Sequence, residues 1–344
     1  MAISLRRSTI KRFLISIIFT SILLFISVLI SFSIGSSGLS PIKVFLNIVG
    51  IERDEYVSKI VSLRVVRTCA AMLTGSLLGL SGLLMQTVTR NPLADPYILG
   101  LASTALTFEA IAILLNPSTL ASRYMLIAIA FIGALTGYGI TYSLSRIAGG
   151  TTLALVLAGI AVASLFSGVS HILLYILNAL NRLPAPWYYL SMGSVVPVLG
   201  SEIIYLIIPL IVGFIVSLLL FKPLNLYIYG DSYVAQYGYK PSFVMSITTV
   251  IASLLTASAT AIVGVVGFLG LAVPHIVRFF VGSDHRFTIP LTVIVGGIVA
   301  LLSDVCVRLV AIYVKGLGEL PLGIITSIIG APFLAYLIVV RVRR

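Results

Sequence analysis

The side chains that could do chemistry are few in this chain, and they gather in short polar breaks between long apolar runs. The sequence has ten acidic residues and three histidines among its 344 residues. The histidines are scattered rather than spaced as a set of ligands, so no metal site is predicted. The chain has no H-E-x-x-H pattern and no credible Ser-His or paired-aspartate arrangement, so an intramembrane enzyme is not favoured.

The first break is the stretch RNPLADPYILG at residues 90–100. Pro92 and Pro96 should end one helix and set up the next, because proline removes a backbone donor and restricts the residue before it. Asn91 and Asp95 can hydrogen-bond the backbone groups that such a break releases, which lipid cannot do. On the residues alone, an ordinary turn between two helices remains the simpler interpretation.

The second break lies in GVVGFLGLAVPHIVRFFVGSDHRFTIP at residues 264–290. Its glycines precede Pro274 and His275, where we expect the helix to break before a short helix leads to Asp284. His275 could be a proton relay or a metal ligand, although a hydrogen-bonded core histidine is the commoner case. Each of the two breaks follows a glycine-rich helix and precedes a short one, and they lie in opposite halves of the chain. This pairing predicts an internal inverted repeat.

A third polar stretch, KPLNLYIYGDSYVAQYGYKPSF, forms the loop 222–242. Glycines at positions 230 and 238 are expected to separate two short helices. The aromatic content of the loop argues against disorder, and a compact loop with exposed tyrosines suits a partner surface.

Three arginines, Arg64, Arg67 and Arg308, lie near the ends of apolar runs on the side that we assign to the outside. Snorkelling of their side chains to lipid headgroups is one interpretation. Docking of an acidic partner is the other.

Long apolar segments must position these polar stretches. Hydrophobic residues make up 59% of the chain, its mean hydropathy is +1.17 and only 9% of its residues are charged, against about 25% in a soluble domain. At about 20 residues per crossing, the sequence predicts an all-α polytopic membrane protein with about ten transmembrane helices in a single domain over 1–344. The expected segments are 13–34, 64–88, 97–115, 124–145, 151–178, 203–221, 243–264, 268–281, 288–314 and 321–340.

Three further features refine this arrangement. The run 13–34 is longer than the core of a signal peptide and is expected to be the first transmembrane helix. Glycines at positions 75, 79 and 82 fall on roughly one face of the run 64–88, which predicts close helix packing. The segment 181–200 is expected to form an interfacial helix or a re-entrant piece.

The basic residues predict the orientation of the chain in the cell membrane. With an even number of spans both termini lie on one side, and the loops on that side carry most of the Lys and Arg. The positive-inside rule therefore places the N- and C-termini in the cytoplasm. The net charge of +12 is explained in this way, and without a basic stripe with interleaved aromatic residues we expect no nucleic acid as a partner.

Together these stretches resemble the permease family of type II ABC importers, which take up iron-siderophore complexes, haem and vitamin B12. The resemblance rests on N-P-L-A-D-P, on P-H-I-V-R followed by D-H-R, and on the order of the matching stretches, and it covers nearly the whole chain from about residue 60. The stretch LRVVR at 63–67 departs from the family, which usually has a proline before the second arginine. The matching signature residues are Asn91, Pro92, Asp95, Pro96, Pro274, His275 and Arg278.

This resemblance implies a transport subunit rather than an enzyme. It implies a homodimer with a translocation path at its axis, two ATP-binding-cassette ATPase subunits inside and an extracytoplasmic substrate-binding protein outside. The chain lacks G-x-x-x-x-G-K-[ST], so no cofactor is expected here, and ATP and Mg are expected on the partner ATPase. Iron-siderophore is the first expected substrate, with cobalamin, haem and oxyanions left open.

The resemblance also assigns roles to particular positions. Arg64, Arg67 and Arg308 match arginines that dock the binding protein, and the segment 151–200 matches the helix and short helix that line and gate the path. The residues that match the ATPase-coupling helices are Gly230, Asp231, Ser232, Tyr233, Val234, Ala235, Gln236, Tyr237 and Gly238.

An ion-coupled secondary transporter is the alternative, since such carriers also use repeats and broken helices. It would need an ionisable residue near the bilayer centre. Glu109 is the best candidate for that residue, with Asp304 as a second.

Overall fold

The computed structural model describes residues 2–35, 41–49, 54–117, 119, 122–182, 191–314 and 320–342. Within these ranges the chain is helical and contains no strand. Each of the ten predicted apolar segments coincides with a helix, which confirms the all-α membrane fold. These helices are α1 (Ala2–Ser33), α3 (Glu55–Val88), α4 (Leu101–Leu115), α5 (Arg123–Ile147), α6 (Thr152–Ala179), α8 (Ile204–Leu219), α11 (Pro241–Val263), α12 (Leu269–Val281), α13 (His285–Tyr313) and α14 (Leu322–Val342).

Seven of the described helices are long and apolar enough to cross a membrane, and three further apolar helices are shorter. A short helix that the sequence analysis missed, α2 (Pro41–Val49), precedes α3. Two more short helices, α9 (Phe221–Tyr227) and α10 (Asp231–Gln236), lie in the predicted loop 222–242.

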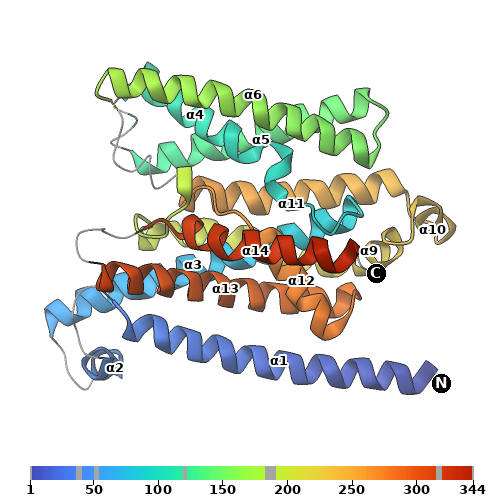
Figure 1. Ribbon diagram of the computed structural model, residues 1–344, viewed down its shortest axis with the longest axis horizontal. Helices are drawn as coiled ribbons and strands as arrows, with labels where there is room; N and C mark the ends of the chain where they lie inside the picture. The colour runs from blue at the N-terminus through green and yellow to red at the C-terminus, as the bar shows by residue number, and fades with distance from the viewer. Residues whose placement is uncertain are drawn as a thin grey trace.

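The long helices lie side by side, with α1 along one edge of the bundle and α6 along the other (Figure 1). The first residues of α1, the last residues of α14, and the short helices α9 and α10 are found at the same end, which we call the terminal end. The C-terminus of α1 and the N-terminus of α3 are found at the other end, which we call the opposite end.

The central helix α3 packs backbone against backbone with two neighbours, as its glycines predict. A Cβ atom at Gly75 would lie 2.1 Å from the carbonyl oxygen of Gly296 in α13, and one at Gly82 would lie 1.8 Å from that of Gly270 in α12. Only glycine permits these approaches, because small residues let membrane helices pack closely. The predicted close-packing face is confirmed.

The second break is not where the sequence analysis placed it. The chain leaves α11 at Gly264, and α12 then runs without interruption through Pro274 and His275. Proline at position 274 cannot donate to the carbonyl of Gly270, four residues earlier. The side-chain amide of Gln86 in α3 donates to that carbonyl at 3.2 Å instead. The helix therefore continues because a neighbouring helix satisfies the freed group.

Part of the segment 181–200 lies outside the described residues, at positions 183–190. The described part is tied to other elements through its backbone. Ser194 donates its amide to the carbonyl of Val263 at 2.7 Å, and Gly323 donates to the carbonyl of Gly193 at 3.2 Å. An interfacial or re-entrant role for the segment stays a prediction.

Candidate functional site

The break that follows α3 is built by its own polar residues. Asn91 accepts a hydrogen bond from the amide of Leu93 at 3.0 Å through its Oδ1 atom. Asp95 accepts one from the amide of Tyr97 at 2.9 Å and so caps η1, a short 3-10 helix over Pro96–Leu99. The prediction that Asn91 and Asp95 satisfy released backbone groups is confirmed.

The two breaks touch each other across the bundle. The hydroxyl of Tyr97 accepts a hydrogen bond from the amide of Val266 at 3.2 Å. His275 lies 2.9 Å from the carbonyl oxygen of Pro92 through Nε2. A carbonyl can only accept, so this nitrogen carries the proton. His275 thus holds one break against the helix that follows the other, and no metal is needed to explain it.

The loop 222–242 folds into the two short helices that were predicted, α9 and α10. Gly230 between them and Gly238 after them have φ angles of +119° and +83°, which favour glycine. Val234 is buried against Val88 of α3 and Tyr227 of α9. The side of α10 that faces away is exposed and carries Asp231, Ser232, Tyr233, Ala235 and Gln236, followed by Tyr237 and Gly238.

Arg90 joins this loop to the end of α3. Its Nε atom donates to the carbonyl oxygen of Tyr227 at 2.9 Å, and its guanidinium lies 4.6 Å from the centre of the Tyr227 ring. It also forms an ion pair with Asp231. Asp231, a predicted ATPase-coupling residue, is therefore engaged within this chain as well as exposed.

A second polar chain connects α9 with α3 and α13. The backbone amide of His285 donates to Oδ1 of Asn225 at 2.9 Å, which fixes the orientation of that side-chain amide. The two imidazole nitrogens of His285 lie 2.7 Å from the same oxygen and 2.8 Å from the hydroxyl of Thr87. The other end of the Asn225 amide donates to Asp284 at 2.9 Å.

Asp284 caps the N-terminus of α13 and lies outside the membrane-spanning segments. Burial opposes the ionisation of its carboxyl, but hydrogen bonds from Arg286 and Asn225 outweigh burial and lower the pKa of Asp284 below its ordinary value. The group is thus held as a carboxylate at neutral pH.

The predicted signature residue Arg278 donates to the side-chain oxygen of Gln86 at 2.6 Å. Gln86 therefore binds both the backbone and a charged side chain of α12. A polar cavity of about 290 Å³ lies beside this contact at the terminal end. It is lined by Gln86, Thr87, Arg90, Pro92, Ile228, Arg278, Ser283 and His285.

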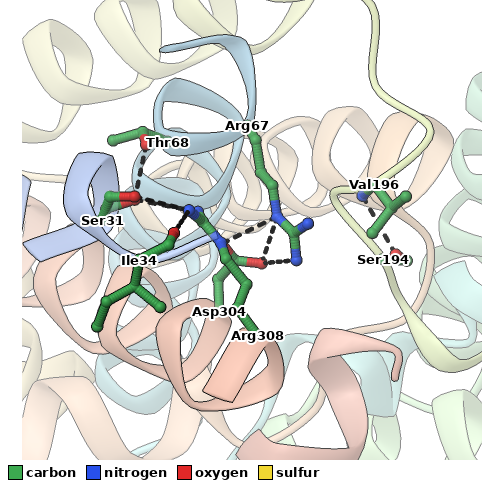
Figure 2. A network of polar contacts seen from close by, with 8 residues as sticks. All are labelled: Ser31, Ile34, Arg67, Thr68, Ser194, Val196, Asp304 and Arg308. Carbon is green, nitrogen blue, oxygen red and sulfur yellow. Dashed lines mark hydrogen bonds and ion pairs between the residues drawn. The ribbon is translucent and has the colours of Figure 1, made fainter. Parts of the chain in front are cut away.

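The three arginines predicted to dock a partner meet at the opposite end. Figure 2 shows Arg67 and Arg308 on either side of Asp304. Arg67 binds the carboxylate at 2.9 Å, and Arg308 binds it while donating to the carbonyl oxygens of Ser31 at 2.7 Å and Ile34 at 3.1 Å. The side chain of Arg308 is only 2% exposed and that of Arg67 is 14% exposed.

Arg64 completes this arginine cluster by donating to the carbonyl oxygen of Phe32 at 2.5 Å. Arg64 and Arg308 thus satisfy carbonyls at the C-terminus of α1, which lack partners within the helix and form the negative end of its dipole. The hydroxyl of Ser31 meets that of Thr68 at 2.7 Å and closes the network. The docking role of the arginines stays a prediction, and Arg308 would have to leave these partners to play it.

Residues 23–340 match the FecCD transport family. The chain belongs to this family. It is 32% identical over 322 residues to the ferric enterobactin transport system permease of Escherichia coli, covering 92% of each chain. It is 34% identical to an iron(3+)-hydroxamate import system permease of Bacillus subtilis, over 80% of this chain and 70% of that one. A solved structure described as an inward-facing metal-chelate type ABC transporter is 27% identical, with a TM-score of 0.80, over 95% of this chain and 99% of that one.

The chain is therefore a multi-pass permease subunit of an ABC importer and not an enzyme, since members of the family leave ATP hydrolysis to separate ATPases. The ion-coupled carrier is not favoured. Asp304, one of its two candidate residues, is the shared partner of two arginines, and Glu109 is buried within α4. Among the described residues, no group of three or more His, Cys, Asp or Glu side chains could hold a metal ion.

Sequence reasoning missed three of the permease residues that tie its elements together. Arg90 appeared only as the first residue of the first break, and Gln86 and Asn225 were not singled out. A glutamine inside an otherwise apolar run was the available signal, because a buried amide in a membrane helix needs partners. The partner of Arg90 lies 141 residues away, and no local pattern could indicate it.

Proposed function

We propose that this permease forms one half of a path through which an iron chelate enters the cell, and that a second copy of the chain completes the path. The relatives named above import ferric enterobactin and iron(3+)-hydroxamate. Their substrates differ in structure but share a chelated ferric ion, which makes this class the best-supported cargo. Cobalamin and haem are the next candidates.

The observation that carries the proposed path is a polar stripe on the exposed edge of α6. Spacings of four, three, four and three residues place its members on one face of the helix. All of them are exposed, and a Cβ atom at Gly168 would meet no heavy atom within 4 Å. Polar side chains facing acyl chains are costly, so this face is suited to water. The stripe consists of Ser164, Gly168, His171, Tyr175 and Asn178.

The chemistry of the stripe fits a chelate better than a bare ion. It offers hydroxyl, imidazole and amide groups but no carboxylate and no permanent positive charge. His171 keeps one ring nitrogen for an outside partner, because its Nδ1 atom lies 2.5 Å from the carbonyl oxygen of Ser167 and must donate to it. Such a lining can pass hydrogen-bonding chelates without holding them tightly.

The partners follow from the two ends of the bundle. We place the terminal end, with both chain termini, in the cytoplasm, where the ATPases with bound ATP and Mg would dock on the exposed face of α10. Tyr233, Gln236 and Tyr237 are the contact residues that we propose there. The substrate-binding protein would dock at the opposite end, above the arginine cluster.

Transport by the reassembled system tests this function. The permease would be reconstituted in proteoliposomes with its binding protein and with the ATPase encoded by an adjacent gene. Uptake of ⁵⁵Fe-labelled ferric hydroxamate or ferric enterobactin would be measured, with ⁵⁷Co-cobalamin in parallel. We expect ATP-dependent accumulation of an iron chelate. Uptake of cobalamin alone would contradict the substrate class, and uptake driven by an ion gradient without ATP would overturn the importer.

The path is tested separately by thiol labelling. After Cys69 and Cys306 are replaced by Ser, Gly168→Cys is compared with Ile22→Cys, an exposed position of α1 that lies eleven residues before the last residue of its helix, as Gly168 does in α6. A membrane-impermeant charged thiol reagent should modify the first and spare the second. Equal reaction at both positions, or reaction at Ile22→Cys alone, would rule out the proposed lining.

The proposed ATPase surface has its own test in co-purification. Tyr233→Ala, Gln236→Ala and Tyr237→Ala should each weaken recovery of the ATPase with a tagged permease. The matched control is Tyr175→Ala, which removes an exposed tyrosine from α6. Full recovery with all three variants of the proposed contact residues would move the docking surface elsewhere.

A further inference from the structure

Arg90 occupies a backbone conformation that suits glycine rather than arginine. It follows the last turn of α3, and its φ angle is +48°. A residue in this left-handed position commonly ends a helix, and it is usually glycine because a side chain there is unfavourable by about 1–2 kcal/mol. An arginine at this position indicates that its side chain has a role that offsets the backbone preference.

The side chain of Arg90 makes three different contacts with the short helices α9 and α10. It donates to the carbonyl oxygen of Tyr227, lies over the ring of the same residue, and pairs with the carboxylate of Asp231. The planar guanidinium fixes the direction of each contact, which a flexible lysine would not do. Asp231 is the first residue of α10, so Arg90 contacts both short helices where one leads into the other.

Residues close to Arg90 in the sequence form hydrogen bonds with α12 and so connect this end of α3 to the membrane helices. Gln86, one turn earlier, binds α12 through two carbonyls and Arg278. The carbonyl of Pro92, two residues later, accepts from His275. A displacement of α9 and α10 that reaches Arg90 is therefore passed to the end of α3, to α12 and to the break at 90–100.

We infer that Arg90 is a positioning residue for energy coupling: it makes the end of α3 follow the short helices when the ATPases move them. This inference rests on the proposed function, because it assumes that ATPases act on α10. The role belongs to the guanidinium and not to the charge alone. Without it, α9 and α10 could move while α3 stays in place.

Arg90→Gly separates this role from a purely structural one. Glycine suits the backbone at position 90, so the variant should assemble with the ATPase and keep its thermal stability and basal ATP hydrolysis. We expect the amount of chelate taken up per ATP hydrolysed to fall roughly tenfold, a common size for a coupling effect between sites. Arg146→Ala, which removes another exposed arginine, in the last turn of α5 at the same end, is the matched control and should stay coupled.

Three further variants test the inference if Arg90→Gly folds poorly. Arg90→Lys retains the charge but not the planar fork, and we expect intermediate coupling. The exchange Arg90→Asp with Asp231→Arg should recover part of the coupling that Arg90→Asp alone loses, because it restores the ion pair but not the bond to Tyr227. Wild-type coupling in Arg90→Gly, or in both Arg90→Lys and Arg90→Asp, would overturn the inference.

The same measurements distinguish this inference from the proposed function. If the wild-type complex shows no ATP-driven uptake, both the proposed function and the inference are contradicted. If ATP hydrolysis is coupled to uptake in the wild type and equally in Arg90→Gly, only the inference is contradicted.

Discussion

The two ends of this bundle hold their charges in opposite ways. At the opposite end, Asp304 and Arg308 are almost fully buried, and the arginines there are bound to a carboxylate and to helix carbonyls. At the terminal end, the side chains of Arg90 and Asp231 are 35% and 61% exposed. The ion pair of Asp304 and Arg308 is buried in protein, whereas that of Arg90 and Asp231 is partly exposed to water.

We call the buried arginine cluster around Asp304 the anchor and the exposed pair of Arg90 and Asp231 the joint. Breaking a buried pair leaves a charge without solvent, so the arginine cluster should hold α1, α3 and α13 in one arrangement. An exposed pair contributes little to stability, so the elements it joins can shift together without unfolding the bundle. The terminal end is thus the end where movement imposed from outside is tolerated, and where we place the ATPases.

The largest expected effect comes from removing the buried carboxylate. Asp304→Ala leaves two arginines without their counter-charge, and we expect a loss of about 3–5 kcal/mol of stability. Asp231→Ala is the matched variant at the other end, with an expected change of about 1 kcal/mol or less. Denaturant unfolding of both variants in detergent measures the contrast, and equal losses would remove the distinction between anchor and joint.

A second prediction concerns the amide that supports α12 beside the joint. Gln86→Leu leaves the carbonyl of Gly270 without a donor, and the expected loss is about 1–3 kcal/mol. Adding Pro274→Ala should recover part of it, because alanine supplies the missing backbone N–H within the helix. No recovery in the double variant would show that Gln86 acts through another contact, such as the one with Arg278.

A third prediction concerns the cap of the first break. Asp95→Ala removes the acceptor for the amide of Tyr97, and we expect about 1 kcal/mol of lost stability together with weaker coupling of ATP hydrolysis to uptake. Asn91→Ala removes a similar hydrogen bond from the same break and serves as the comparison. Unchanged uptake and stability in Asp95→Ala at normal expression would show that the break does not depend on its cap.

The smallest expected effect is a pH dependence at the terminal end. Because the pKa of Asp284 is lowered in the folded protein, its contribution to stability is present above the ordinary aspartate value of about 4 and is lost as the pH falls through the folded value. Asp284→Asn should therefore be less stable than wild type at pH 7, and the two should converge as the pH falls below about 4. Melting temperatures across that range check this, and a constant difference would contradict it.

The sequence was sufficient for the parts of this structure that depend on local pattern. Ten apolar segments predicted ten helices, and the spacing of three glycines predicted the tight face of α3. The helix α2 was missed because it lies between two of the expected membrane segments and its nine residues are too few to cross a membrane. The break assigned to Pro274 was wrong because the amide that satisfies Gly270 comes from another helix, 184 residues away.

The same contrast between local patterns and contacts of distant residues applies to the candidate site. Asn91 and Asp95 act on amides two residues away, so their roles could be inferred from the sequence. The pairing of Arg67 with Asp304 spans 237 residues, and only the packed bundle reveals it. Asp304 was considered as an ion-coupling residue because the sequence showed a carboxylate in an apolar run but not the arginines around it.

The backbone contacts of Gly75 and Gly82 have a consequence for how this protein exchanges its amide hydrogens. Because α3 touches both α12 and α13 without intervening side chains, none of the three can open alone without separating from the others. In deuterium, the central amides of these helices should exchange together and last, while those of the exposed helix α6 exchange earlier.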